Sequence, residues 1–99
     1  MTIERNGNKT TVYAAGRIDA NHAPQFAADM ENALKDTREL VIDCSKLEYI
    51  SSSGLRAVML AVKTMNKQGS MRIVNVRKDT YALLEMTGFT GMCEVETPR

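Results

Sequence analysis

Hydrophobic and polar residues alternate along two stretches near the start of the chain. The alternation predicts a short strand over residues 2–5 and a longer one over 9–18. Asn6-Gly7-Asn8 separates the two, and Asn-Gly between strand-like stretches is typical of a tight hairpin. One face of the longer strand carries Val12, Ala14, Gly16 and Ile18. We therefore expect these strands to pair antiparallel at one side of a sheet.

Apolar residues then recur at helical spacing in three further stretches, which predicts three helices. Each predicted helix begins at polar residues that can cap it and ends at residues that favour a turn. The starts are Asp19-Ala20-Asn21 with Pro24 in the first turn, the serines 51–53, and Asp79-Thr80. The ends are Asp36-Thr37, Gly69 and Gly88.

Three more strands are predicted between and after these helices. Residues 40–44 form a continuous apolar run that suits an interior strand, and a loop is expected over 45–49. Residues 71–76 and 92–95 give the last two strands. The order predicts an α/β fold: a mixed β-sheet with an N-terminal antiparallel hairpin and three helices in right-handed crossovers. Without repeats or linkers, the chain is expected to form a single domain, 1–99.

Charge and composition exclude several classes of partner. The formal net charge is +1, so no overall field attracts nucleic acid or an anionic membrane. Three tyrosines, two phenylalanines and no tryptophan offer little for stacking on bases. No apolar run has the length that spans a bilayer, and the first residues contain no apolar signal core. We expect a cytoplasmic protein that binds neither nucleic acid nor membrane directly.

The chain also lacks the motifs of common enzymes and cofactor sites. Cys44 and Cys93 lie far apart in apolar stretches, without metal-ligand spacing, and are expected to be buried reduced thiols. His22, the one histidine, is expected on the solvated surface. No phosphate-binding glycine loop, dinucleotide fingerprint or serine-nucleophile motif is present. We therefore expect no metal, no cofactor and no catalytic activity.

The functional loops of an open α/β sheet lie beyond the carboxyl ends of its parallel strands. Here these loops begin at Asp19, after residue 44, and near Arg77. Ser51-Ser52-Ser53-Gly54 is the most informative segment. One interpretation is that its serines cap a helix. However, one serine is enough for a cap, and three serines before a glycine make an open helix start that favours an added phosphate.

Two motifs of this chain resemble those of the STAS family, the sulfate-transporter and anti-sigma-factor-antagonist domains, and they follow each other in the order found in that family. The stretch from Leu40 to Arg56 is similar to the family signature, and Gly16-Arg17-Ile18-Asp19 is similar to its strand-end G-x-[LI]-D. Gly88-Phe89 matches the place after the third helix. The resemblance covers nearly the whole chain and implies the STAS fold. Many members carry an aspartate where this chain has Ser51.

One branch of the STAS family comprises the anti-sigma-factor antagonists, which act in bacterial transcription regulation. In this branch, the residue before the motif glycine is phosphorylated. The kinase is itself an anti-sigma factor, and a serine phosphatase reverses the step. The resemblance therefore implies Ser53 as acceptor, with Ser52 and Ser51 as alternatives. The unphosphorylated form would bind the anti-sigma factor and release a sigma factor. Asp19 matches the family aspartate beside the acceptor, either as a direct contact or as a turn cap.

Spacing places a set of residues on the outward face of the second helix: Arg56, Leu60, Lys63 and Lys67. This face is either a solvated basic surface or a partner contact. The residues predicted to contact a partner are Asp19, Ser52, Gly54, Leu55, Arg56, Leu60 and Lys63. An alternative function is a STAS subunit of a lipid-transport or signalling assembly that uses the same edge without phosphorylation.

Overall fold

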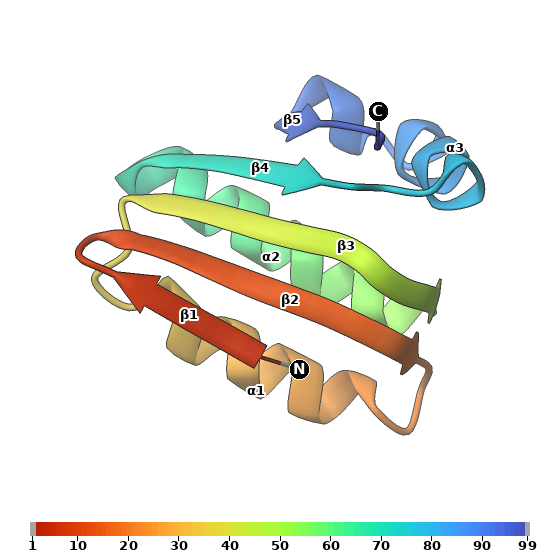
Figure 1. The fold of residues 1–99 in the computed structure, drawn as a ribbon, viewed down its shortest axis with the longest axis horizontal. Helices are drawn as coiled ribbons and strands as arrows, with labels where there is room; N and C mark the ends of the chain where they lie inside the picture. The colour runs from red at the N-terminus through yellow and green to blue at the C-terminus, as the bar shows by residue number, and fades with distance from the viewer. Residues whose placement is uncertain (1, 99) are drawn as a thin grey trace.

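The sequence folds into one mixed sheet with strand order β1-β2-β3-β4-β5 (Figure 1). The computed structural model describes residues 2–98. The elements in chain order are β1 (Thr2–Asn6), β2 (Lys9–Ile18), α1 (Ala23–Leu34), β3 (Glu39–Ile50), α2 (Ser52–Gln68), β4 (Ser70–Val74), α3 (Lys78–Met86), the short 3-10 helix η1 (Phe89–Gly91) and β5 (Glu94–Val95). This order confirms the predicted α/β fold.

The hairpin between β1 and β2 forms because its turn tolerates a left-handed backbone. Gly7 has φ +64, a conformation that costs glycine little. β1 pairs antiparallel with β2, and Ile3 lies opposite Val12. β2, β3, β4 and β5 then pair in parallel. The predicted antiparallel hairpin at one side of the sheet is therefore confirmed.

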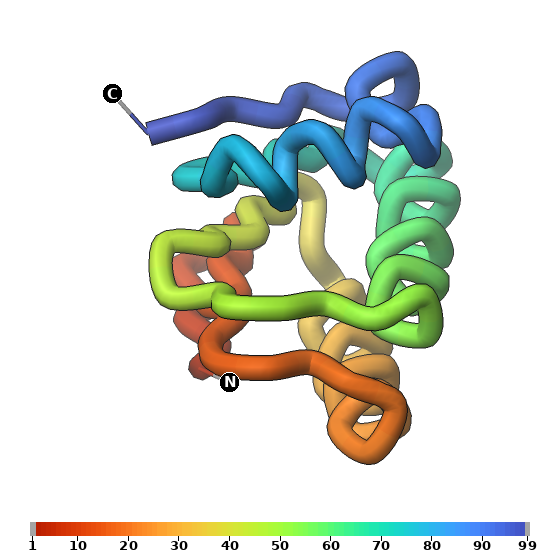
Figure 2. The backbone as a smooth tube through the Cα atoms, turned by 90° about the vertical axis from the view of Figure 1, so that its right-hand side faces the viewer, coloured from red at the N-terminus to blue at the C-terminus, as the bar shows by residue number. Residues whose placement is uncertain are grey.

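Helices α1 and α2 lie side by side on one face of the sheet (Figure 2), and the main core fills the space between them and the strands. Both helices bury the apolar stripe that the sequence predicts. The largest fully buried side chains include Met30, Leu40, Ile42, Met65, Ile73 and Phe89. Since α1 and α2 each return the chain to the start of the next parallel strand, both helices begin at the same end of the sheet.

The prediction of a loop over residues 45–49 was wrong, because β3 continues to Ile50. The backbone of this segment keeps pairing with β2, with register shifts between Tyr13 and Ala15 and between Gly16 and Arg17. Such shifts break the simple alternation by which a strand is recognised. The side chain of Leu47 still enters the core, so burial confirms that the segment is part of the sheet.

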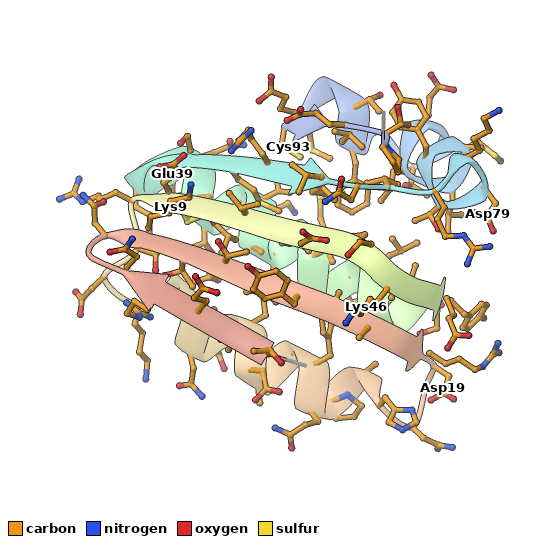
Figure 3. The ribbon with its side chains drawn as sticks, in the orientation of Figure 1. Lys9, Asp19, Glu39, Lys46, Asp79 and Cys93 are labelled. Atoms are coloured by element: carbon orange, nitrogen blue, oxygen red, sulfur yellow. The ribbon has the colours of Figure 1, made fainter. Side chains whose placement is uncertain are left out.

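The two ends of the parallel strands are named here by their backbone direction. The amino edge is the end at which β2 and β3 begin, near Lys9 and Glu39, and the carboxyl edge is the end beyond Ile18 and Ile50. Figure 3 shows Lys9 and Glu39 at one end of the sheet and Asp19 at the other.

Polar side chains connect the elements at the amino edge. The hydroxyl oxygens of Thr10 and Thr37 lie 2.8 Å apart and are buried. Gln68 donates from Nε2 to the backbone oxygens of Leu34 and Thr37, each at 2.8 Å. The Arg5 guanidinium donates to the backbone oxygen of Lys35 at 2.7 Å, just after the end of α1. These bonds satisfy carbonyls that a helix end leaves without partners.

Candidate functional site

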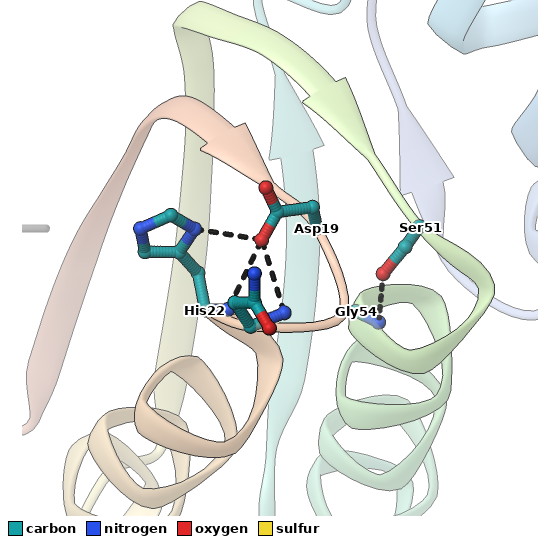
Figure 4. A network of polar contacts seen from close by, with 5 residues as sticks. Asp19, His22, Ser51 and Gly54 are labelled. Atoms are coloured by element: carbon teal, nitrogen blue, oxygen red, sulfur yellow. Dashed lines mark hydrogen bonds and ion pairs between the residues drawn. The ribbon is translucent and has the colours of Figure 1, made fainter.

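The carboxyl edge brings the two predicted functional loops together. The backbone N–H of Ser51 donates to the backbone oxygen of Ile18 at 2.8 Å, so the serine segment starts directly beside the end of β2. Figure 4 shows the Asp19 loop and the start of α2 next to each other. The prediction that Asp19 and the serines share one edge of the sheet is confirmed.

Ser51 is the residue that caps α2. Its backbone is extended, with φ −82 and ψ 171, and its Oγ accepts a hydrogen bond from the backbone N–H of Gly54 at 3.2 Å (Figure 4). Serine and aspartate are both strong N-cap residues because each offers a side-chain oxygen to the free N–H groups. Ser51 therefore meets a capping need that an aspartate at this position would also meet.

Ser52 and Ser53 differ from Ser51 in having unused hydroxyl groups. Both side chains are exposed, and neither forms a side-chain hydrogen bond within residues 2–98. They occupy the first turn of α2, where backbone N–H groups lack helical partners and the helix dipole is positive. The first turn carries no acidic side chain to offset this potential. An added anionic group would find a favourable field here.

Two of the residues predicted to contact a partner are buried in this structure. Gly54 is buried, and a Cβ at this position would lie 2.7 Å from Cγ1 of Ile50 and 3.0 Å from Cγ2 of Ile18. Leu55 is 9% exposed and packs in the core. Both residues face inward because the first turn of α2 sits directly on the strand ends. Their role at the site is to hold Ser53 in place.

Asp19 fixes the loop that precedes α1. One carboxylate oxygen, Oδ1, accepts hydrogen bonds from the backbone N–H groups of Asn21 and His22 at 3.1 and 3.2 Å, and from His22 Nδ1 at 2.7 Å. The bond from the His22 side chain holds the pKa of Asp19 below its ordinary value. Within residues 2–98, Oδ2 takes part in none of the hydrogen bonds of this loop. Asp19 is therefore a turn cap with one oxygen still available, and His22 is exposed as predicted.

The outward face of α2 is exposed as the spacing predicts. Arg56, Lys63 and Lys67 are exposed, and the Leu60 side chain between them is 60% exposed. No ion pair joins any of the three cations to another group in the described part of the chain. The predicted contact residues therefore divide into an exposed group on α2, the buried pair Gly54 and Leu55, and the partly exposed Asp19 in the loop before α1.

One contact at the carboxyl edge was missed by the sequence reasoning. The guanidinium of Arg17 lies over the Tyr49 ring, 4.6 Å from its centroid, and the two residues are paired across β2 and β3. Cation–π contacts of this kind are weakly stabilising at exposed sites. The contact depends on the extension of β3, so predicting a loop over 45–49 concealed it. The third predicted loop contributes an ion pair between Arg77 and Asp79 at 3.8 Å.

The two cysteines are free thiols in different surroundings. Cys44 is buried as predicted, and burial raises the pKa of its thiol to about 12. Cys93 is only half-buried, although burial raises its pKa as well. Across residues 2–98, no three His, Cys, Asp or Glu side chains gather as metal ligands, and no helix has the length and hydropathy to cross a membrane.

A family model described as "Mlab, STAS domain" matches residues 1–94. The chain belongs to the STAS domain family. Among curated relatives of this STAS domain, the anti-sigma-B factor antagonist of Listeria monocytogenes is 27% identical over 95 residues, which cover 94% of this chain and 83% of the relative.

Solved STAS structures share the fold at lower identity. An anti-sigma factor antagonist from Mycobacterium paratuberculosis superimposes with a TM-score of 0.86 at 23% identity, covering 99% of this chain and 84% of that one. The Bacillus protein SpoIIAA in its phosphorylated form gives a TM-score of 0.77 at 15% identity, covering 97% and 90%. Its unphosphorylated form gives 0.78 at 13% identity, covering 99% and 87%. This STAS domain therefore has the same fold as both forms of SpoIIAA.

Proposed function

We propose that this chain is an anti-sigma factor antagonist whose binding is switched by phosphorylation of Ser53. Its partners are an anti-sigma factor with serine kinase activity and a serine phosphatase, and it acts in the cytoplasm as a binding protein without catalytic activity of its own. The names of the curated relatives support the antagonist role. The observation that carries the proposal is the exposed, unbonded hydroxyl of Ser53 in the first turn of α2, beside the Asp19 loop.

The geometry supports Ser53 over Ser51 as the acceptor. The Ser51 oxygen is engaged in the cap of α2, and a phosphate there would disturb the bond to Gly54 N–H. Ser53 has no such task and lies directly before the motif glycine, Gly54. Ser52 is also exposed, so the position relative to the glycine is what favours Ser53 over Ser52.

The switch works at the surface and leaves the fold intact. A phosphate adds about −1.5 to −2 charges at pH 7, and at a helix N-terminus the dipole favours it by roughly 0.3–1 kcal/mol. Arg56, one turn further along α2, is available to pair with it in the free protein. An interface is different, because a phosphate pressed against a partner loses its water, and burial without a new cation costs roughly several kcal/mol. The similar TM-scores to both forms of SpoIIAA support a switch without refolding.

The test is phosphorylation of the purified chain by a cognate anti-sigma factor kinase with ATP, followed by mass spectrometry to locate the phosphate. We expect one phosphate on Ser53 in the parent, and none in the folded Ser53→Ala variant. Ser52→Ala and Ser51→Ala are the matched controls, and both are expected to be labelled. Full labelling of Ser53→Ala would show that the acceptor is another serine.

A second candidate function is supported by the family model, whose description is "Mlab, STAS domain" and does not mention an antagonist. In this alternative, the same carboxyl edge binds a partner in a lipid-transport or signalling assembly without phosphorylation. Mass spectrometry of the chain purified from its own cells separates the two candidates. A phosphate fraction on Ser53 supports the first, and uniformly unmodified protein that co-purifies with a transporter subunit supports the second.

A further inference from the structure

An open groove of about 440 Å³ runs between α1 and α2, on the side of the helices away from the sheet core. Its walls are built mainly from small or apolar side chains: Pro24, Ala27 and Ala28 from α1, and Ala57, Leu60 and Ala61 from α2. Packed helices lie about 8–10 Å apart, and alanines fill little of the space above their line of contact. The groove exists because the facing positions on both helices are small.

The groove lies near the proposed phosphorylation site, and its lining on α2 starts at Ala57, beyond Ser53. Ser53 and Ala57 are one turn apart on α2, about 6 Å along the helix axis, and this face continues through Ala61. On the other wall, Pro24 lies in the first turn of α1, directly after the Asp19 loop. Since both helices start at the carboxyl edge, the end of the groove at Pro24 and Ala57 is the end nearest the Asp19 loop and the serines.

The two helices carry opposite charge, and the cations of α2 lie beside the groove and not in its lining. Helix α2, which the structure describes throughout, contains three basic residues and no acidic one, and the exposed Leu60 lies on the same face as its cations. Helix α1, also fully described, contains Asp29 and Glu31 and no basic residue, and Glu31 lines the groove. Unpaired cations beside an exposed apolar groove are the arrangement expected of a binding surface for an acidic amphipathic segment.

We propose that this groove binds one amphipathic helix of the protein partner, with its apolar side between α1 and α2 and acidic residues on the edge that faces α2. The inference rests on the proposed function for the identity of the partner. The groove follows α1 from Pro24 to Leu34, about 15 Å, which accommodates roughly three turns of helix. The basic α2 face favours an acidic segment over a second copy placed with α2 against α2, because two basic faces would then oppose each other.

This occupant also explains how one phosphate can control binding. An acidic helix that pairs with Arg56 and Lys63 would lie within about one helical turn of a phosphate on Ser53, just beyond the end of the groove. The phosphate would repel the acidic edge and neutralise the nearest cation, Arg56. The same charge pattern that favours the unphosphorylated complex therefore opposes the phosphorylated one.

The groove can be tested with a synthetic helix. The probe is a 14-residue helical peptide with Leu and Ala at i, i+3, i+4 and i+7 and Glu along one edge, and its matched control carries Lys in place of Glu. Binding is followed by amide NMR shifts of the isotope-labelled full chain. We expect saturating shifts at Ala28, Ala57 and Leu60, and at least threefold tighter binding of the Glu peptide. Absence of shifts at these residues, or shifts confined to the sheet around Tyr13, would overturn the proposal.

Variants of the full chain test whether the anti-sigma factor kinase binds in the groove. Ala28→Phe fills the groove, and Leu60→Glu places a negative charge among the α2 cations. Both sites are exposed, so circular dichroism should remain that of the parent. We expect each of these two variants to weaken binding to the anti-sigma factor kinase at least tenfold. Met86→Glu on α3, where Met86 is 85% exposed, is the control and should stay within twofold.

The outcomes separate the two proposals. If the parent binds the kinase and both groove variants bind equally well, the groove proposal fails and the antagonist function stands. If the parent does not bind the kinase at all, the proposed function fails, and the peptide experiment still decides whether the groove accepts a helix.

Discussion

The amino edge and the carboxyl edge of the same strands use their polar groups in opposite ways. At the amino edge, Thr10, Thr37 and Gln68 are bonded to one another or to backbone oxygens and are largely shielded from solvent. At the carboxyl edge, the hydroxyls of Ser52 and Ser53 are exposed and unbonded. Satisfied polar groups stabilise a fold, whereas unsatisfied exposed ones are available to a partner. With the proposed function, this chain separates stability from recognition along its sheet.

The largest effect expected is on binding, at the carboxyl edge. Phosphorylated Ser53 should lower affinity for the anti-sigma factor at least 100-fold, about 2.7 kcal/mol, while the free energy of unfolding stays near that of the parent. Isothermal titration of both forms measures the first quantity, and urea denaturation measures the second. Ser53→Asp should show a smaller loss of affinity, because a carboxylate carries less charge than a phosphate. Equal affinity of the two forms would contradict the switch.

The next effect is on stability, at the amino edge. Thr37→Val removes the hydroxyl that donates to the Ala33 backbone oxygen at 2.6 Å and leaves the Thr10 hydroxyl buried without a partner. We expect a loss of about 1–3 kcal/mol in the free energy of unfolding and unchanged affinity of the folded protein for its partner. The Thr10→Val, Thr37→Val double variant should lose less than the sum of the single variants. A loss of affinity in folded Thr37→Val would contradict the idea that the amino edge serves stability and the carboxyl edge serves recognition.

Ser51 sharpens the comparison because it is the one serine of the three with a structural task. Ser51→Ala should lower the free energy of unfolding by about 1 kcal/mol through loss of the cap. Ser51→Asp should restore it, since aspartate caps a helix equally well. Ser52→Ala and Ser53→Ala should change stability by less than about 0.5 kcal/mol. Thermal denaturation of the four variants side by side distinguishes cap from acceptor, and equal destabilisation by all three alanine variants would not fit these roles.

The smallest effect concerns acid. The pKa of Asp19 is lowered from 3.8 by the bond from His22, so the ionised carboxylate stabilises the native loop above that pH. This contribution is lost as pH falls through the lowered native pKa. Asp19→Asn should therefore reduce the dependence of unfolding free energy on pH below about 4. Asp43 is the other carboxyl with a lowered pKa: burial raises that pKa, but the hydrogen bonds from Ser45 and Asn75 together lower it by more. Asp43→Asn is therefore the control variant. Parallel curves for parent and Asp19→Asn would contradict the assignment.

Local signals in the sequence were sufficient for most of the fold. Asn6-Gly7 predicted the hairpin, Pro24 and the serines predicted helix starts, and Gly69 predicted the end of α2, because each acts through its own backbone or first turn. The carboxyl edge could be predicted for the same reason: both of its loops follow directly from strand ends.

The sequence could not reveal features that depend on distant partners. The continuation of β3 past Cys44 depends on pairing with β2 through register shifts, so its polar residues resembled a loop. The bonds of Thr10 and Gln68 join residues 27 to 34 positions apart. The three serines have the same chemistry in the sequence, and only the extended backbone of Ser51 identifies the cap. The inward direction of Leu55 likewise follows from how α2 sits on the strands.

The close packing of Gly54 against Ile18 and Ile50 has a consequence for the kinetics of recognition. Because the first turn of α2 rests on two strand ends, the backbone that carries Ser53 is already held in place before any encounter. A partner then has no loop to close and little chain to order, and conformational steps of this kind are what slow association. The collision rate and the α2 cations should therefore set how fast the complex forms, and phosphorylation, which offsets these cations, should slow association as well as shorten the lifetime of the complex.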